Sequence, residues 1–284
     1  MSFGETPTNL FIQEHELQNR TLEFGGLDSG PTKAVIFDFI GTLIEVKGYN
    51  LEESTMKLCR AIAEEGFNVD PKCFLDAYSS AHEKYQVVRY QELIEVTNAI
   101  WIAEALNNLG FNTNSEDTRI RTAVNVFFKD YLNSLRLRSC TRKMLQKTSS
   151  DYKLGLISNF TYAPVIHAGL RKLDINHFFN AILVSEDVGW RKPHRQIFET
   201  ALKRLKVDAE ETVYVGDSPQ EDIRGAKTVG MKTIFIPSQF YSTENLLESK
   251  QKPDMMVTDV CELAVKLPEF LKKADQLKHV SKRK

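Results

Sequence analysis

Polar and charged side chains follow several apolar runs of this sequence, at the points where the runs end. Asp38 comes directly after the run Ala34 to Phe37, and the turn-forming pair Gly41-Thr42 closes the segment. A carboxylate at the end of a buried strand can attack an electrophile, hold a metal ion, or do both. It can also simply cap a turn. The segment therefore predicts nucleophilic or metal chemistry, with a structural alternative.

Two later segments place other reactive groups in the same way. Ser158-Asn159 follows the apolar pair Leu156-Ile157, and hydroxyl, amide and backbone N–H groups at a helix start can hold an anionic oxygen. Lys192, stiffened by Pro193, can neutralise clustered negative charge. Taken singly, Ser158 could be an ordinary helix N-cap and Lys192 an exposed surface lysine.

A group of carboxylates follows the apolar run Val213 to Val215. Asp217 and Asp222 lie in the segment GDSPQEDI, in the turn ahead of a predicted helix. Grouped carboxylates suit Mg²⁺, a hard cation that takes oxygen ligands. By themselves they could equally be acidic residues that stabilise a helix N-terminus.

The elements that must position these groups alternate between strand and helix. Besides Ala34 to Phe37, the sequence predicts strands at Leu154 to Ile157, Ala181 to Val184, Thr212 to Val215, Thr233 to Ile236 and Met255 to Val257. Helical stretches lie between them. This alternation predicts an α/β fold, a Rossmann-like three-layer core with a parallel sheet.

The stretch from Leu51 to Leu137 predicts several helices, which breaks at Gly66 to Pro71 and Gly110 to Ser115 separate. Its apolar residues recur at helix spacing: Met56, Leu58, Cys59, Ile62 and Ala63, then Ile94, Ala99, Ile100, Ile102, Ala103 and Leu106. An all-helical insert after the first strand indicates a lid over the edge of the sheet. The predicted organisation is a flexible extension (1–31), a core domain (32–48 and 138–275), a helical cap (49–137) and a basic tail (276–284).

Composition narrows the possible partners and compartments. The 284 residues are 42% hydrophobic and 26% charged, with a net charge of −1. The chain as a whole therefore has no positive electrostatic field that would attract nucleic acid or an anionic membrane. No apolar stretch reaches the roughly 18 residues that a membrane helix needs, and no signal-peptide core is present. Cys59, Cys73, Cys140 and Cys261 are scattered, which predicts free thiols and a cytoplasmic protein.

Taken together and in this order, the four chemical segments resemble the haloacid dehalogenase superfamily of hydrolases. The resemblance covers Thr32 to about Phe270 and rests most on the sequences ISNF, SEDVGWRKP and VGDSPQEDIRGAKTVGM. It is closest to members of subfamily IA, which carry a helical C1-type cap between the first two motifs, and among them to the rhythmically-expressed-gene-two-like proteins. Four motifs in register are far more specific than any one of them.

The resemblance implies a role for each group. Asp38 would be the nucleophile that forms an aspartyl-phosphate, and Ser158 and the N–H group of Asn159 would bind a phosphoryl oxygen. Lys192 would offset the negative charge. The metal ligands of Mg²⁺ would be Asp38, the backbone carbonyl of Ile40 and Asp217, with Asp222 in support.

Ile40 departs from the family pattern. The phosphatases of the family carry an Asp at this position, which protonates the leaving alcohol and then activates water. Isoleucine can do neither, and general acid–base catalysis is typically worth about 10² to 10⁴ in rate. We therefore expect slow hydrolysis of alkyl phosphates.

Three functions agree with these residues. The first is a Mg²⁺-dependent phosphatase of a small phosphorylated metabolite, which Asp217 and Asp222 favour. The second is a 2-haloacid dehalogenase, because those enzymes also lack the second Asp, although they use no metal. The third is a catalytically impaired protein that uses the fold for binding, for which Ile40 argues.

Substrate choice would come from the cap, which closes over the site and excludes water. Lys84 and Arg89, within the segment HEKYQVVRY, are candidate substrate-binding residues, with a solvated helix face as the alternative. The predicted partner is thus a small phosphorylated molecule, and neither nucleic acid nor membrane. A monomer and a homodimer fit the sequence equally well.

Overall fold

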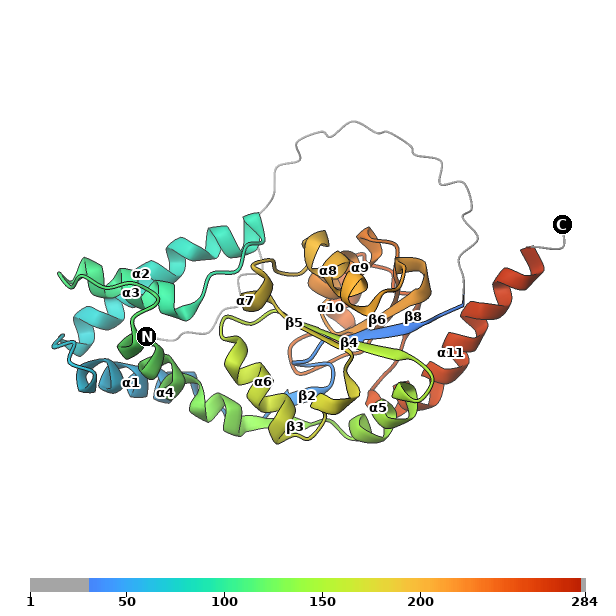
Figure 1. Ribbon diagram of the computed structural model, residues 1–284, viewed down its shortest axis with the longest axis horizontal. Coiled ribbons are helices and arrows are strands. Elements are labelled where there is room, and N and C mark those ends of the chain that lie inside the picture. The colour runs from blue at the N-terminus through green and yellow to red at the C-terminus, as the bar shows by residue number, and fades with distance from the viewer. Residues whose placement is uncertain (1–30, 282–284) are drawn as a thin grey trace, which may run out of the picture.

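The structure is a computed structural model that describes residues 31–281, with side chains described for residues 31–272 (Figure 1). All but the last residue of the predicted N-terminal extension lies outside the described residues. The predicted basic tail does not begin at a break, because helix α11 continues to Ser281.

The centre of the molecule is a six-stranded parallel sheet in the order β5-β4-β1-β6-β7-β8. The strands are β1 (Ala34–Phe37), β4 (Lys153–Ser158), β5 (Ala181–Val184), β6 (Thr212–Gly216), β7 (Lys232–Phe235) and β8 (Met255–Met256). β1 lies between β4 and β6, with Val35 level with Leu154 on one side and Val213 on the other. All five predicted strand segments after the first fall on these strands, so the α/β prediction is confirmed.

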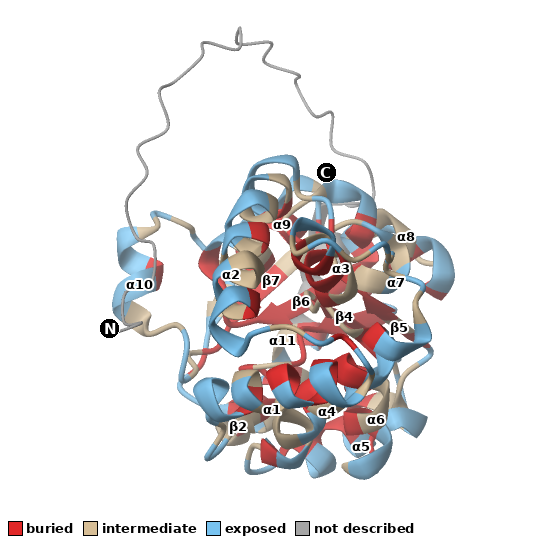
Figure 2. Ribbon diagram, turned by 90° about the vertical axis from the view of Figure 1, so that its left-hand side faces the viewer, coloured by how far each residue is buried: buried red, intermediate tan, exposed pale blue. Residues whose placement is uncertain are grey.

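Helices cover both faces of this sheet, which explains why β1 is apolar on both sides. Val35 packs in one cluster with residues of α5 (Thr141–Ser149), α6 (Ala163–Lys172) and α11 (Val260–Ser281). Ile36 packs in another with residues of α8 (Arg195–Leu205) and α9 (Gly225–Thr228). Successive strand residues point to opposite faces, so both must be apolar. Figure 2 shows the resulting distribution, with buried residues along the sheet and exposed residues on the outer helix surfaces.

Helix α11 follows the last strand, β8. The other helices of the core lie between strands in sequence: η2 (Asn176–Phe178), α7 (Ser185–Val188), η3 (Ala209–Glu211), η4 (Pro219–Arg224) and α10 (Thr243–Glu248).

The cap is a group of helices that projects from one side of the core (Figure 1). It comprises α1 (Leu51–Glu64), α2 (Pro71–Val87), η1 (Val88–Glu92), α3 (Asn98–Asn108) and α4 (Thr118–Ser134). A two-stranded antiparallel ribbon of β2 (Ile44–Val46) and β3 (Leu135–Leu137) joins it to the core. The sequence analysis did not predict this ribbon, because three-residue strands carry almost no periodic signal.

The sequence analysis was wrong to count Ile94 among the helical positions of the cap. Helix η1 ends at Glu92, the next residue Leu93 has a left-handed φ of 59°, and α3 begins only at Asn98. Between them Ile94 forms an isolated antiparallel bridge with Trp190 of the core. An apolar residue that packs against an extended segment has the same hydrophobicity as one on a helix, so spacing alone did not separate them.

The prediction of four free thiols was wrong for two cysteines. Cys140 and Cys261, 121 residues apart in sequence, form a disulfide, while Cys59 and Cys73 are free. The pairing arises because the starts of α5 and α11 lie together, which no local pattern reveals. In the part of the chain that the structure describes, no helix is long and apolar enough to cross a membrane.

Candidate active site

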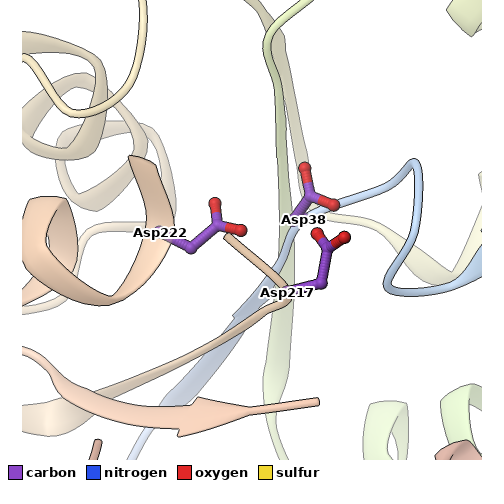
Figure 3. A group of neighbouring side chains, drawn as sticks. All are labelled: Asp38, Asp217 and Asp222. Atoms are coloured by element: carbon purple, nitrogen blue, oxygen red, sulfur yellow. The ribbon is translucent and has the colours of Figure 1, made fainter. Parts of the chain in front are cut away.

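Three carboxylates meet at the carboxyl edge of the central strands (Figure 3). Asp38 follows β1, Asp217 follows β6, and Asp222 lies one turn further, in η4. Each offers an oxygen atom, and these three atoms lie within 4.8 Å of one another, although all three residues are at most 5% exposed. Like charges are held this close in a buried place only with a cation nearby or with some of them protonated.

Asp38 has one oxygen atom held and one without a partner. Its Oδ1 accepts a hydrogen bond of 2.7 Å from Lys192 Nζ, while its buried Oδ2 has no hydrogen-bond partner. Burial raises the pKa of Asp38 to about 6; the charge of Lys192 opposes this shift and that of Asp222 adds to it. A fixed carboxylate with an unpartnered, desolvated oxygen is suited to attack an electrophile or to bind a metal ion.

Asp217 is positioned by the loops after β1 and β7. Its Oδ2 accepts a 2.5 Å hydrogen bond from Ser238, and its Oδ1 a longer one of 3.4 Å from Thr42. Gly41, at φ 97°, lies directly against it, because a Cβ atom at position 41 would be 2.2 Å from Asp217 Oδ2. Only glycine therefore allows Asp217 to approach Asp38. Burial raises the pKa of Asp217 well above its ordinary value, and the charge of Asp38 adds to this.

Asp222 uses both of its oxygen atoms within the protein. Oδ1 accepts from Lys192 Nζ at 2.7 Å and from the Tyr214 hydroxyl at 3.1 Å, and Oδ2 accepts from the backbone N–H of Ser218 at 2.9 Å. Asp222 thus fixes the lysine and the loop that carries Asp217. Tyr214 was not predicted, although a tyrosine within an otherwise apolar strand is a signal that a buried hydroxyl needs a partner.

Lys192 is a fully enclosed cation at the centre of this group. Besides the two carboxylates, its Nζ atom donates to the carbonyl of Ile157 at 3.2 Å and contacts the Tyr214 hydroxyl at 3.2 Å. Burial disfavours the charge, but Asp222 and Asp38 outweigh it and raise the pKa of Lys192 well above its ordinary value. The lysine is therefore a permanent positive charge beside Asp38.

The donor set of this site fits Mg²⁺. It consists of carboxylate oxygens, one of them unpartnered, on two segments, the loop after β1 and the loop and helix η4 after β6. Hard divalent cations take such oxygen ligands, and a cation would remove the repulsion between the carboxylates.

Comparison with known proteins identifies this arrangement. The model of the family "Haloacid dehalogenase-like hydrolase" matches residues 35–236, which include the three carboxylates and Lys192. The chain belongs to this family. It is 30% identical over 230 residues, 80% of this chain and 95% of the other, to the glyceraldehyde 3-phosphate phosphatase of Methanothermobacter thermautotrophicus.

Solved structures agree with the fold of a haloacid dehalogenase-like hydrolase. A 2-haloacid dehalogenase from Pseudomonas syringae superposes with a TM-score of 0.59 at 22% identity and covers 85% of this chain and 99% of its own. The hydrolase YfnB from Bacillus subtilis, bound to magnesium, superposes with a TM-score of 0.50 at 17% identity and covers 82% and 97%. At these identities the likeness concerns the fold alone.

The other predicted residues of this hydrolase occupy three kinds of position. Ser158 is buried at the end of β4, and the side-chain amide of Asn159 pairs with the backbone of Lys192, donating to its carbonyl at 3.0 Å and accepting from its N–H at 2.8 Å. Ile40 is half-buried beside Asp38 and packs against the apolar core. Asn159 therefore contacts the Lys192 segment, Ser158 precedes it at the end of β4, and Ile40 lies two residues after Asp38.

Lys84 and Arg89, the candidate substrate-binding residues, have no described contact with the three carboxylates. Lys84 is exposed on α2 and forms an ion pair of 2.9 Å with Glu104. Arg89 is buried, its Nε atom lies 2.9 Å from Glu95, and its guanidinium lies over Trp101. Among the described contacts, none joins Lys84 or Arg89 to Asp38, Asp217 or Asp222. Ser238, which holds Asp217, was missed by the sequence analysis although it follows a predicted strand.

Proposed function

We propose that this hydrolase is a Mg²⁺-dependent phosphatase of a small phosphorylated metabolite and that Asp38 is its nucleophile. The observation that carries the proposal is the unpartnered, buried Oδ2 of Asp38 beside the permanent charge of Lys192. The related phosphatase of M. thermautotrophicus is named for a three-carbon sugar phosphate, which favours a phosphorylated sugar of this size as substrate.

Mg²⁺ would be held by Asp38, the backbone carbonyl of Ile40 and Asp217. When bound, it would offset the repulsion between the carboxylate and the phosphoryl oxygens. Asp222 would act on this site indirectly, because both of its oxygens are already used by Lys192, Tyr214 and Ser218. Binding of magnesium by the structurally similar YfnB supports this metal.

The chain's own residues account for the remaining steps. Asp38 Oδ2 attacks phosphorus, the new P–O bond forms as the bond to the leaving oxygen breaks, and water then hydrolyses the aspartyl-phosphate. Ser158 and the N–H group of Asn159 hold a phosphoryl oxygen at the end of β4. Lys192 keeps the Asp38 carboxylate oriented and ionised. Because Ile40 provides no acid, the leaving oxygen takes its proton from solvent, which makes good leaving groups the faster substrates.

A second candidate function is hydrolysis of a carbon–halogen bond, which Ile40 favours because a halide leaves without a proton. Asp217 disfavours it, since the dehalogenases of this group use no metal. Chloride release from 2-chloropropionate in EDTA would distinguish this reaction from phosphate hydrolysis.

We extend the proposal to the subfamily and setting of the protein. The motifs ISNF and SEDVGWRKP favour the rhythmically-expressed-gene-two-like branch. The cytoplasmic location stays a prediction, and the Cys140–Cys261 disulfide argues for a less reducing compartment. Whether the enzyme is a monomer or a homodimer also stays open to measurement.

The proposal is tested by p-nitrophenyl phosphate hydrolysis with Mg²⁺, with EDTA, and by an Asp38→Asn variant. This ester needs little protonation of its leaving group, so Ile40 should not prevent its turnover. We expect hydrolysis that requires both Mg²⁺ and Asp38. A folded wild-type protein that releases no p-nitrophenol, or an Asp38→Asn variant that retains activity, would refute the proposal.

A further inference from the structure

Besides the β2–β3 ribbon and the contacts of α4 with Phe160 and Tyr162, the cap contacts the core at a further place. We call it the cap strap: residues 93–95 of the cap paired with residues 189–191 of the core. The N–H of Glu95 donates to the carbonyl of Gly189 at 2.9 Å, and the N–H of Arg191 donates to the carbonyl of Leu93 at 2.8 Å. Helix α7, which leads into this core segment, faces the cap in Figure 1. The strap thus ends one residue before Lys192.

The side chain of Glu95 is the polar centre of the strap. It is 1% exposed, and its Oε1 lies 2.9 Å from Arg89 Nε while its Oε2 lies 2.6 Å from an Nη atom of Arg191. Oε2 also accepts a hydrogen bond from the Ser185 hydroxyl. One carboxylate therefore neutralises two buried guanidinium groups, one from the cap and one from the core.

The core partners of Glu95 reach each of the three later active-site loops. Ser185 Oγ accepts a 2.8 Å hydrogen bond from the N–H of Phe160, in the loop of Ser158 and Asn159. Arg191 precedes Lys192, and its other Nη atom lies 3.6 Å from Glu221, the neighbour of Asp222. Arg191 Nε has no partner of its own, so Glu95 and Glu221 supply the guanidinium's ion-pair contacts in the described structure.

We propose that Glu95 is a positioning residue, through which the docked cap fixes the phosphoryl-binding loop and the Lys192 segment in their active arrangement. It touches no reacting atom and acts through Ser185 and Arg191. Without its charge, Arg89 would lose this ion pair and Arg191 would keep only the longer contact with Glu221, which would weaken the strap. The proposal gives Arg89 a role as an ion-pair partner of Glu95. Its kinetic part rests on the proposed phosphatase function.

The test compares Glu95→Gln with Glu211→Gln. Glu211 is a buried carboxylate at the end of η3, just before β6, that pairs with the more exposed Lys33, so its replacement removes a buried carboxylate charge of the core. For Glu95→Gln we expect kcat on p-nitrophenyl phosphate to fall by about 10²-fold, the effect typical of a small misplacement, with the Mg²⁺ requirement unchanged. Glu211→Gln should retain the wild-type kcat.

Two further measurements separate positioning from loss of stability. Amide hydrogen exchange should accelerate at residues 158–160 and 189–192 in Glu95→Gln, and not in Glu211→Gln. In a double-mutant cycle, Arg191→Met should add little to the loss of kcat already caused by Glu95→Gln, because both act on one contact. If Glu95→Gln does not fold, Ser185→Ala removes one contact of the same carboxylate and should show the same local exchange.

The proposal is overturned if Glu95→Gln keeps the wild-type kcat, or if exchange at residues 158–160 and 189–192 is the same as in Glu211→Gln. Should the wild-type protein lack phosphatase activity, the proposed function fails while the exchange comparison still decides whether Glu95 holds the loops.

Discussion

Two buried charge clusters lie side by side in this protein, and they differ in their balance. Around Lys192, a single cation faces the three carboxylates of Asp38, Asp217 and Asp222. Around Glu95, two guanidinium groups face two carboxylates, those of Glu95 and Glu221. The first cluster has surplus negative charge and the second has none.

The two clusters differ in whether their buried carboxylate oxygens all have partners, which separates a site that can bind a cation from one that holds segments together. In the first cluster Asp38 Oδ2 has no partner, and burial, with a smaller contribution from the neighbouring carboxylates, raises the pKa values of Asp38 and Asp217. In the second, the Glu95 carboxylate has a donor at each of its oxygens. A buried cluster that is short of a cation can accept one from solution, whereas a balanced cluster can only hold its surroundings in place.

The sharpest test of this contrast replaces one cation in each cluster. Lys192→Met should lower kcat on p-nitrophenyl phosphate by about 10³-fold or more and destabilise the fold by about 3–5 kcal/mol, because it leaves buried carboxylates unpaired. Arg191→Met should lower kcat by no more than about 10²-fold. Steady-state kinetics and urea unfolding of both variants give the two numbers, and equal losses of kcat would break the comparison.

Within the first cluster, Asp217 and Asp222 should respond differently to substitution. Asp217→Asn should raise the Mg²⁺ concentration for half-maximal activity by about 10- to 100-fold, because it removes a metal ligand. Asp222→Asn should lower kcat with little change in that concentration, since Asp222 holds Lys192. Mg²⁺ titrations of the two variants provide the measurement. The same metal shift in both would show that Asp222 binds the ion directly.

A substitution at Ile40 tests whether the carboxylate cluster around Lys192 lacks only a general acid for full activity. Ile40→Asp should raise turnover of alkyl phosphates by up to about 10²-fold and that of p-nitrophenyl phosphate by less, because the nitrophenolate leaves without protonation. Ile40→Asn, which has the same size but transfers no proton, is the control and should give no increase. A folded Ile40→Asp variant with unchanged turnover would argue that another part of the site limits catalysis.

The smallest expected effect is a pH-dependent stabilisation by Mg²⁺. Burial raises the pKa of Asp38 from 3.8 to about 6, so the metal-free fold favours the protonated carboxyl, and its stability falls as pH rises between these values. Mg²⁺ requires the ionised form, so its stabilising effect should be small at pH 5 and largest above pH 7.

The gain in unfolding free energy should be about 2.7 kcal/mol when free Mg²⁺ is 100 times its Kd. Thermal unfolding at constant ionic strength, with Mg²⁺ or EDTA, measures it. Asp38→Asn should lose most of the gain, and a gain of equal size at pH 5 and pH 8 would contradict the assigned ligands.

The sequence signals for the residues around Lys192 are local. Asp38 and Asp217 directly follow apolar strands, Ser158 ends one, and parallel strands bring their carboxyl ends to one edge. The strand segments themselves are short apolar runs bounded by turn residues, which is a pattern of a few neighbouring positions. Because the strands are parallel, residues at their carboxyl ends could be expected at one edge of the sheet from the sequence alone.

The balanced cluster could not be predicted in this way. Arg89 was taken for a substrate-binding residue because it lies among aromatic and basic neighbours, yet its partner Glu95 is held by Arg191, 96 residues further along the chain. A charged residue has the same local pattern whether it faces solvent or a buried counter-charge. Only the docking of the cap on the core decides which.

By itself, then, the amino-acid sequence determined the parallel sheet and the polar residues at the ends of its strands. It also determined that position 40 carries isoleucine, which cannot act as an acid. The tertiary structure alone decided that Ser238 and Tyr214 support the carboxylates, that Cys140 pairs with Cys261, and that Glu95 joins the cap to the core. The physical reason is the range of the forces involved. Backbone preferences and hydrophobic patterns act between near neighbours in sequence, whereas hydrogen bonds, ion pairs and disulfides depend on distances that exist only after the chain has folded.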